Sequence, residues 1–263
     1  AQDCAGVCDG TSYEDDCGTC DDDSSNDCEQ YNIALDGVDL ISFYALPDNS
    51  SVENIFGSIE DQNPAILGAG MSAIYDADSQ DWFGTLINIE PTDGYWVVID
   101  GAADVYVEGI PTDPNTIYNL QQYTNLISYP FEGSAAVEET IPTDAQSFID
   151  AILGEGQAAL NNHETDEWYG ALDFLEGKKG YWFITNAEVS FTFNAPVGGM
   201  ARMASLIRPV PLEYRFRQST QQAFYFVDNA TIDGEPIEME DMIIIYNGDV
   251  IVGSRYWYGD VTD

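Results

Sequence analysis

The first 28 residues hold all five cysteines of the chain together with a dense set of aspartates. Residues 3–28 read DCAGVCDGTSYEDDCGTCDDDSSNDC and contain almost no large apolar side chain. A segment without a hydrophobic core needs disulfides or bound metal to hold one structure. The residues that offer this chemistry are the cysteines Cys4, Cys8, Cys17, Cys20 and Cys28 and the aspartates Asp3, Asp9, Asp15, Asp16, Asp21, Asp22, Asp23 and Asp27.

Three interpretations fit these residues. Closely spaced carboxylates broken by glycines suit Ca²⁺, which takes about six to eight oxygen ligands, and disulfides would complete such a unit. A zinc site from Cys4, Cys8, Cys17 and Cys20 fits the CxxC spacing, but dense aspartates are not typical of zinc knuckles. A solvated acidic tail without metal is the third. We expect disulfides with Ca²⁺ held by the aspartates, and one odd cysteine whose partner lies in another repeat or chain.

The motifs DCAGVCDG and DDCGTC resemble the DCxGxCxG and DxCGxC repeats found in tandem in large secreted proteins of marine bacteria. Those repeats are similar in design to the calcium-binding Asp/Cys repeats of thrombospondins. The resemblance covers residues 3–28 and implies a secreted protein with a Ca²⁺-binding N-terminal repeat, at residues 1–30. The pattern departs from an EF-hand, because it has no DxDxDG loop with a distal glutamate.

Four tryptophans recur at matching places in two stretches of the chain. The pairs are Trp82 with Trp168 and Trp96 with Trp182, each 86 residues apart. The same offset relates LISF to LISY and AILGAG to AILGEG. This register predicts two homologous modules, at residues 31–111 and 117–195. The LIS…WFG…GYW pattern also resembles a repeat of the same secreted proteins, where it is similar to a spacer or display module.

The paired aromatic side chains have two possible uses. On an exposed flat face, the four tryptophans would form a platform for sugar rings. Inside each module they would serve packing, and this is what we expect, because a duplication preserves a core as readily as a binding site.

The elements that must position these residues are short and mostly β. Apolar stretches separated by Gly, Asp and Asn predict a compact antiparallel fold in each module. Apolar spacing predicts helices at Val52–Ile59 and at Ala145–Leu153. Strands are expected at LISFY and LISYPF and at residues 72–75, 82–87, 95–99, 105–107, 181–185 and 189–193.

The C-terminal part reads as a linker, residues 196–211, followed by an incomplete β-sandwich-like unit, residues 212–263. Asn247-Gly248-Asp249 predicts a hairpin turn. The stretch from QSTQQAFYF to GSRYW resembles modules of secreted marine bacterial proteins whose pattern continues further. We expect this small sheet to be completed by strands from a neighbouring copy or from a continuation of the chain. Strands are expected at Leu212–Phe216, Ala223–Val227, Met242–Tyr246 and Val250–Val252.

Charge excludes several classes of partner. The net charge is −40, and residues 1–201 carry 37 acids against two lysines. Binding to nucleic acid or anionic membranes needs clustered Lys and Arg, so neither is expected. No apolar run approaches the roughly 18 residues of a membrane span, so no membrane insertion is expected. No signal peptide is visible, and the opening AQDC is compatible with a cleaved end or with the edge of a longer chain.

Catalytic motifs are absent from the sequence. His163 is the only histidine and its counterpart is Ala77, and no GxSxG, HExxH or P-loop occurs. We therefore expect a non-enzymatic, mainly β, extracellular or cell-surface protein with a structural or adhesive role, in filaments or in contact with other surface proteins. The alternative is a polysaccharide-binding accessory region of a secreted hydrolase, and an enzyme in its own right comes third.

Overall fold

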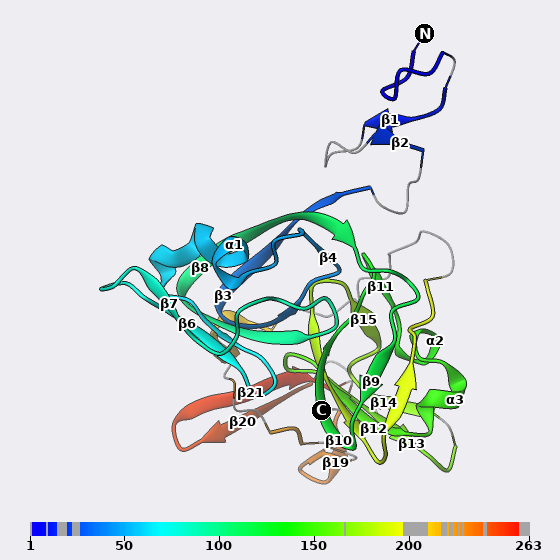
Figure 1. Ribbon diagram of the computed structural model, residues 1–263. Helices are drawn as coiled ribbons and strands as arrows, with labels where there is room; N and C mark the ends of the chain where they lie inside the picture. The colour runs from blue at the N-terminus through cyan, green and yellow to red at the C-terminus, as the bar shows by residue number, and fades with distance from the viewer. Residues whose placement is uncertain are drawn as a thin grey trace.

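The structure is a computed structural model that describes residues 2–8, 10–14, 20–22, 27–165, 167–196, 210–216, 220, 223–225, 227, 229–238 and 241–257. Every strand pair in these ranges is antiparallel. The mainly β prediction is thus confirmed. Figure 1 shows two β-rich bodies side by side, with the N-terminal segment extending away from the first.

The first body is one sheet, in the order β3-β8-β5-β6-β7, with β4 beside β8. Helix α1 (Val52–Phe56) and the 3-10 helix η1 (Gly57–Gln62) follow β4, as the apolar spacing predicts, and bury Ile55 and Ile59 in the core. The Ser51 hydroxyl caps α1 by accepting the Asn54 N–H. The strands are β3 (Glu29–Ser42), β4 (Ala45–Leu46), β5 (Ala65–Leu67), β6 (Ser72–Asp76), β7 (Asp81–Gly84) and β8 (Gly94–Pro111).

The second body has a sheet in the order β10-β16-β12-β13-β14. Two small sheets, β9 with β17 and β11 with β15, and helices α2 (Val137–Thr140) and α3 (Thr143–Gln146) complete it. Aromatic rings fill its core, where Phe193 packs edge-on against Tyr129 and Phe183. The strands are β9 (Tyr118–Leu120), β10 (Tyr123–Ser128), β11 (Ser134–Ala136), β12 (Ile149–Leu153), β13 (Ala158–Asn162), β14 (Glu167–Gly170), β15 (Phe174–Glu176), β16 (Gly180–Thr185) and β17 (Val189–Phe191).

The pairing registers of the two main sheets are related by the same shift as the sequences. Trp96 lies opposite Leu40 in the first sheet, and Trp182 lies opposite Leu126 in the second. Trp182 follows Trp96 by 86 residues, and Leu126 follows Leu40 by the same number. The matched side chains therefore occupy the same places in two sheets of the same strand order, and we call the two bodies the first and second module.

Two predicted elements are wrong. Residues 149–153, expected in a helix, form β12, which pairs with β13 on one side and β16 on the other. Ile149 and Ile152 are fully buried there, and so short a buried apolar run has no spacing that separates a strand from a helix. Residues 212–216, expected in a strand, contain a 3-10 turn, η2 (Leu212–Tyr214), and Leu212 is exposed.

The two ends of the chain form small hairpins. Strands β1 (Tyr13–Glu14) and β2 (Cys20–Asp21) pair in the N-terminal segment. In the described part of residues 212–263, β18 (Thr231–Ile232) pairs with β19 (Glu235–Pro236), and β20 (Met242–Asn247) pairs with β21 (Val250–Tyr256) around a turn in which Gly248 has a φ of 64°. The expected strand at 223–227 lies partly outside the described residues, and 223–225 form none.

Candidate functional site

The two modules contact each other through reciprocal backbone bonds. The Ser42 N–H donates to the Lys178 carbonyl, and the Ser128 N–H donates to the Thr92 carbonyl, both at 3.1 Å. Each donor and each acceptor of one bond lies 86 residues from its counterpart in the other. An isolated β-bridge adjoins each bond. The contact thus has the symmetry of an isologous dimer interface within one chain.

An apolar cluster lies between the modules. Leu40, Trp96 and Leu126 are buried in it, and Trp182 packs against them. Leu40 and Leu126 are counterparts, as are the two tryptophans. The cluster is therefore built from the same positions of both modules.

Two glycines allow this close approach. A Cβ at Gly94 would lie 3.0 Å from the carbonyl oxygen of Ile127, and one at Gly180 would lie 2.7 Å from that of Ile41. A side chain at either position would push the modules apart. The sequence signal for this interface is the glycine that precedes each YW pair. The apolar periodicity of the strands does not show that the modules contact each other there.

The interface also holds the only two lysines of the chain. Lys179 Nζ lies 3.6 Å from Glu155 Oε2, and the same carboxylate accepts the Leu40 N–H at 3.2 Å. Burial raises the pKa of Glu155, although Lys179 acts in the opposite direction. Asp93 occupies the place of Lys179 in the first module, and burial, with a smaller effect of Glu90, raises its pKa as well.

The four tryptophans considered for a sugar platform are all packed. Trp96 is buried and Trp182 lies against it at the interface. Trp82 and Trp168 are half-buried against the cores of their modules. Their indole N–H groups donate to equivalent partners, Glu60 Oε1 at 2.9 Å and Gln146 Oε1 at 3.3 Å. These contacts favour packing over a flat exposed platform.

Disulfides are present in the N-terminal segment, as expected. Cys4 is bonded to Cys20, and Cys28 is also disulfide-bonded, whereas Cys8 is an exposed free thiol. Cys17 lies outside the described residues. A zinc site that uses Cys4 and Cys20 is not compatible with this bond, because zinc needs free thiolates.

The predicted calcium ligands are only partly described. The carboxylate of Asp3 accepts the Val7 N–H at 2.7 Å, that of Asp22 accepts the Thr11 hydroxyl at 3.4 Å, and that of Asp27 accepts the Tyr13 hydroxyl at 2.5 Å. Among the described residues, no three His, Cys, Asp or Glu side chains gather as a metal site. The predicted ligands outside the description are Asp9, Asp15, Asp16 and Asp23, together with the side chain of Asp21.

His163 forms a surface pair. Its Nε2 lies 2.8 Å from Asp150 Oδ1, and both side chains are exposed to more than 40%. The amide of Asn186 donates to the same oxygen at 2.9 Å. The carboxylate thus contacts two neighbours at the surface, an arrangement typical of a solvated polar contact.

Comparison with protein-family models found no match, and comparisons with curated proteins and with solved structures found none either. No helix in the described ranges is long and apolar enough to cross a membrane.

Proposed function

We propose that this chain is a non-enzymatic extracellular structural protein, stabilised by calcium and able to assemble with itself at a cell surface or in a filament. The proposal rests on the finding that the residues repeated in both modules serve packing. The matched tryptophans and glycines hold the cores and join the modules. The duplication therefore preserves a rigid body rather than a pair of binding surfaces.

The packing of the tryptophans argues against the alternative of a polysaccharide-binding region. Sugar platforms present the flat face of an indole to solvent. Here the interior covers Trp96, and the indole N–H groups of Trp82 and Trp168 are bonded within their own modules. Binding through these four side chains would require the modules to open.

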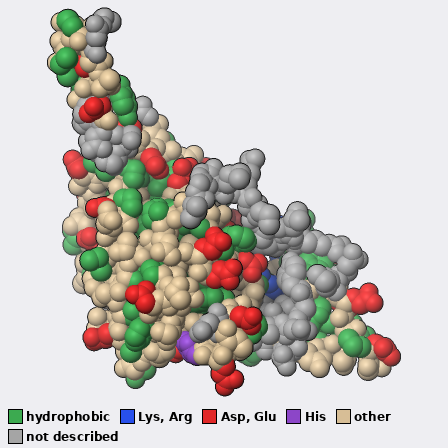
Figure 2. Space-filling model, turned by 90° about the vertical axis from the view of Figure 1, so that its right-hand side faces the viewer, with side chains coloured by type: hydrophobic (Ala, Val, Ile, Leu, Met, Phe, Trp, Pro, Cys, Tyr) green, Lys and Arg blue, Asp and Glu red, His purple; other side chains and the backbone are tan. Residues whose placement is uncertain are grey.

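The N-terminal segment supports the calcium and the extracellular setting. Disulfides such as Cys4–Cys20 persist in oxidising surroundings outside the cytosol. Acidic side chains are spread over the face that Figure 2 presents, with almost no basic side chain among them. Divalent cations would screen this repulsion and allow two copies to approach.

The experiment is sedimentation velocity of the purified chain over a range of concentrations, in calcium and in chelator. Assembly above the 28.9 kDa monomer that grows with concentration and with calcium supports the proposal. A monomer under every condition contradicts it. Retention on insoluble polysaccharides, measured in parallel with the Trp82→Ala variant, tests the alternative, since platform binding would be lost in that variant.

A further inference from the structure

An apolar row crosses the sheet of the first module on the face that points away from the core of that module. The interface cluster of Leu40 and Trp96 lies on the same face. The five residues of the row pair directly across neighbouring strands and are Val38, Val98, Ala65, Ile74 and Phe83. The inner end of the row lies near the second module, where Val38 packs on the interface cluster. The outer end is bare, because Ile74 and Phe83 are 51% and 53% exposed. The bare end thus continues an interface that the chain already uses.

The corresponding row of the second module is less exposed. Leu160 and Tyr169, the counterparts of Ile74 and Phe83, pair in the same register and are half-buried. The C-terminal unit lies at this module, where Arg255 on β21 donates to the Gly156 carbonyl at 2.9 Å. Gly156 is half-buried, whereas its counterpart in the first module, Gly70, is exposed. The first module therefore exposes a surface that its duplicate shields.

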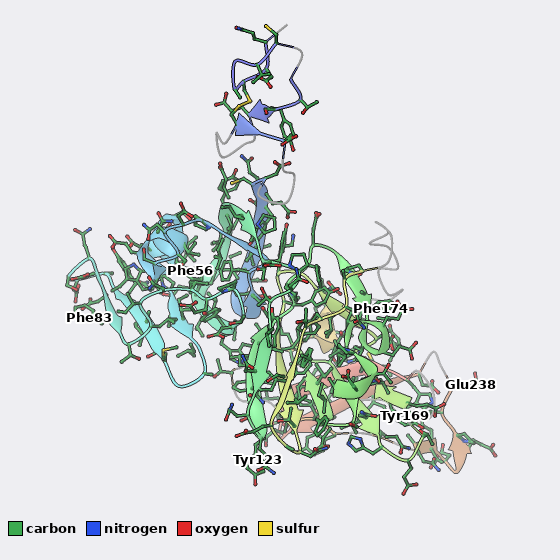
Figure 3. All side chains as sticks on the ribbon, turned by 45° about the vertical axis from the view of Figure 1, so that its right-hand side comes forward. Phe56, Phe83, Tyr123, Tyr169, Phe174 and Glu238 are labelled. Atoms are coloured by element: carbon green, nitrogen blue, oxygen red, sulfur yellow. A yellow bond between two sulfur atoms is a disulfide. The ribbon has the colours of Figure 1, made fainter. Side chains whose placement is uncertain are left out.

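The hairpin of β20 and β21 has a buried base and an apolar tip. At the base, Tyr256 and Trp257 are buried. At the tip, Tyr246 and Val250 are 55% and 63% exposed, and Ile245 and Val252 are exposed as well. Figure 3 shows Phe83 at the far edge of the first module, away from these salmon-coloured strands. The tip and the bare row therefore lie on different parts of the molecule.

Charge favours the hairpin as the occupant of the bare row. Residues 31–111 contain 14 acids and no base, so two first modules repel each other. All five arginines of the chain lie in residues 202–263, which also hold ten acids and so have a net charge of −5. A copy that approaches with its C-terminal end is therefore repelled less by the first module than a copy that approaches with its own first module.

We propose that the apolar tip of the β20–β21 hairpin of one copy docks on the bare row, at Ile74 and Phe83, of a second copy. This inference rests on the proposed function and names the contact that would build the assembly. The two surfaces differ, so the contact is heterologous and leaves one free row and one free tip in every dimer. Repetition of such a contact gives an open chain of molecules or a ring.

The test uses two variants that each remove one surface. The row variant carries Ile74→Ser and Phe83→Ser, and the tip variant carries Tyr246→Ser and Val250→Ser. Ile117→Ser is the control, because Ile117 is 60% exposed and belongs to neither surface. Light scattering after size-exclusion chromatography, in calcium, gives the mass of each variant and of their mixture.

We expect each variant alone to need at least about ten times the wild-type concentration to associate, because exposed apolar anchors dominate such contacts. The mixture should form particles of two chains, through the intact tip of one variant and the intact row of the other. Formation of that dimer also shows that both variants are folded. The control should assemble like the wild type.

Other outcomes would overturn the inference and show which surfaces are in contact instead. Assembly of both variants like the wild type would place the contact elsewhere and leave the proposed function standing. Dimers of the row variant alone would indicate a tip-to-tip contact, and dimers of the tip variant alone a row-to-row contact. A wild-type chain that stays monomeric would contradict the proposed function itself.

Discussion

Ser42 and Ser128 each donate a backbone hydrogen bond to the other module, and the two bonds are equivalent, with the same length of 3.1 Å. Both serines are fully buried, and the hydroxyl of each donates to a carbonyl of the other module at 2.6 Å. Polar groups buried in this way are costly to separate, because each would lose its partner. The two modules therefore act as one body, with an internal two-fold relation.

Substitution of Gly180 tests this interface. In Gly180→Ala the new Cβ would meet the Ile41 carbonyl, so we expect a loss of about 1–3 kcal/mol in the free energy of unfolding. Gly57→Ala is the control, because a Cβ there has no neighbour within 4 Å and the backbone is helical, so stability should stay the same or rise by up to about 1 kcal/mol. Urea unfolding measures both. Equal effects of the two substitutions would contradict the interface.

Trp82 donates its indole N–H to Glu60, whereas Trp168 in the second module donates to Gln146, so a glutamine can replace Glu60 as the acceptor. Glu60→Gln reproduces the bond of Trp168 to Gln146 and should keep stability within about 0.5 kcal/mol. Glu60→Ala leaves a half-buried N–H without its partner and should cost about 1 kcal/mol. Thermal unfolding of the two variants measures these changes in stability. A glutamine as harmful as the alanine would show that the charge of Glu60, and not its hydrogen bond, matters.

Stability should fall between mildly acidic and neutral pH. The pKa of Asp93 is raised above its ordinary 3.8, chiefly by burial, so the folded chain holds this proton to higher pH than the unfolded chain. The free energy of unfolding then decreases as pH rises from the ordinary carboxyl range through the raised pKa. The pKa values of Glu29 and Glu155 shift in the same direction, also through burial.

Replacement of Asp93 should weaken this pH dependence. Asp93→Asn has no proton to release, so its stability should change less between about pH 4 and pH 7 than that of the wild type. Asp104→Asn removes the same charge at an exposed position and serves as the control. Chemical denaturation across this range gives the slopes. An Asp93 variant with the wild-type slope would rule out the assignment.

In the monomer, calcium removal should affect the N-terminal segment alone. Closely spaced aspartates repel one another without a cation, so amide hydrogen exchange in residues 3–28 should accelerate in chelator. Exchange in β8 (Gly94–Pro111) should not change, because this strand pairs within the first module. Unchanged exchange in residues 3–28, together with no calcium uptake by calorimetry, would contradict the predicted site.

The duplication makes much of the fold predictable. The offset of 86 residues assigns Trp96 and Trp182 to equivalent positions from the sequence alone. The helix predicted at 145–153 is correct only for residues 145 and 146, which belong to α3, and fails at 149–153 because its basis is apolar spacing rather than the offset. The same offset relates residues 151–153 of β12 to residues 65–67, which have the identical sequence AIL and form β5.

The module interface is not predictable from periodicity. A strand that is buried on both faces shows no alternation, so nothing in the sequence assigns Trp96 to the outer face and Tyr95 to the core. Likewise, the local sequence does not show why Ile74 and Phe83 are exposed while their counterparts, Leu160 and Tyr169, are half-buried. The disulfides are predictable because residues 3–28 hold all five cysteines and have no hydrophobic core.

Electron microscopy of the wild-type chain in millimolar calcium tests the assembly most directly. We expect particles joined end to end through repeated contacts between the C-terminal hairpin and the first module, with lengths that grow with concentration and shrink in chelator. Single particles at every concentration, with and without calcium, would contradict it.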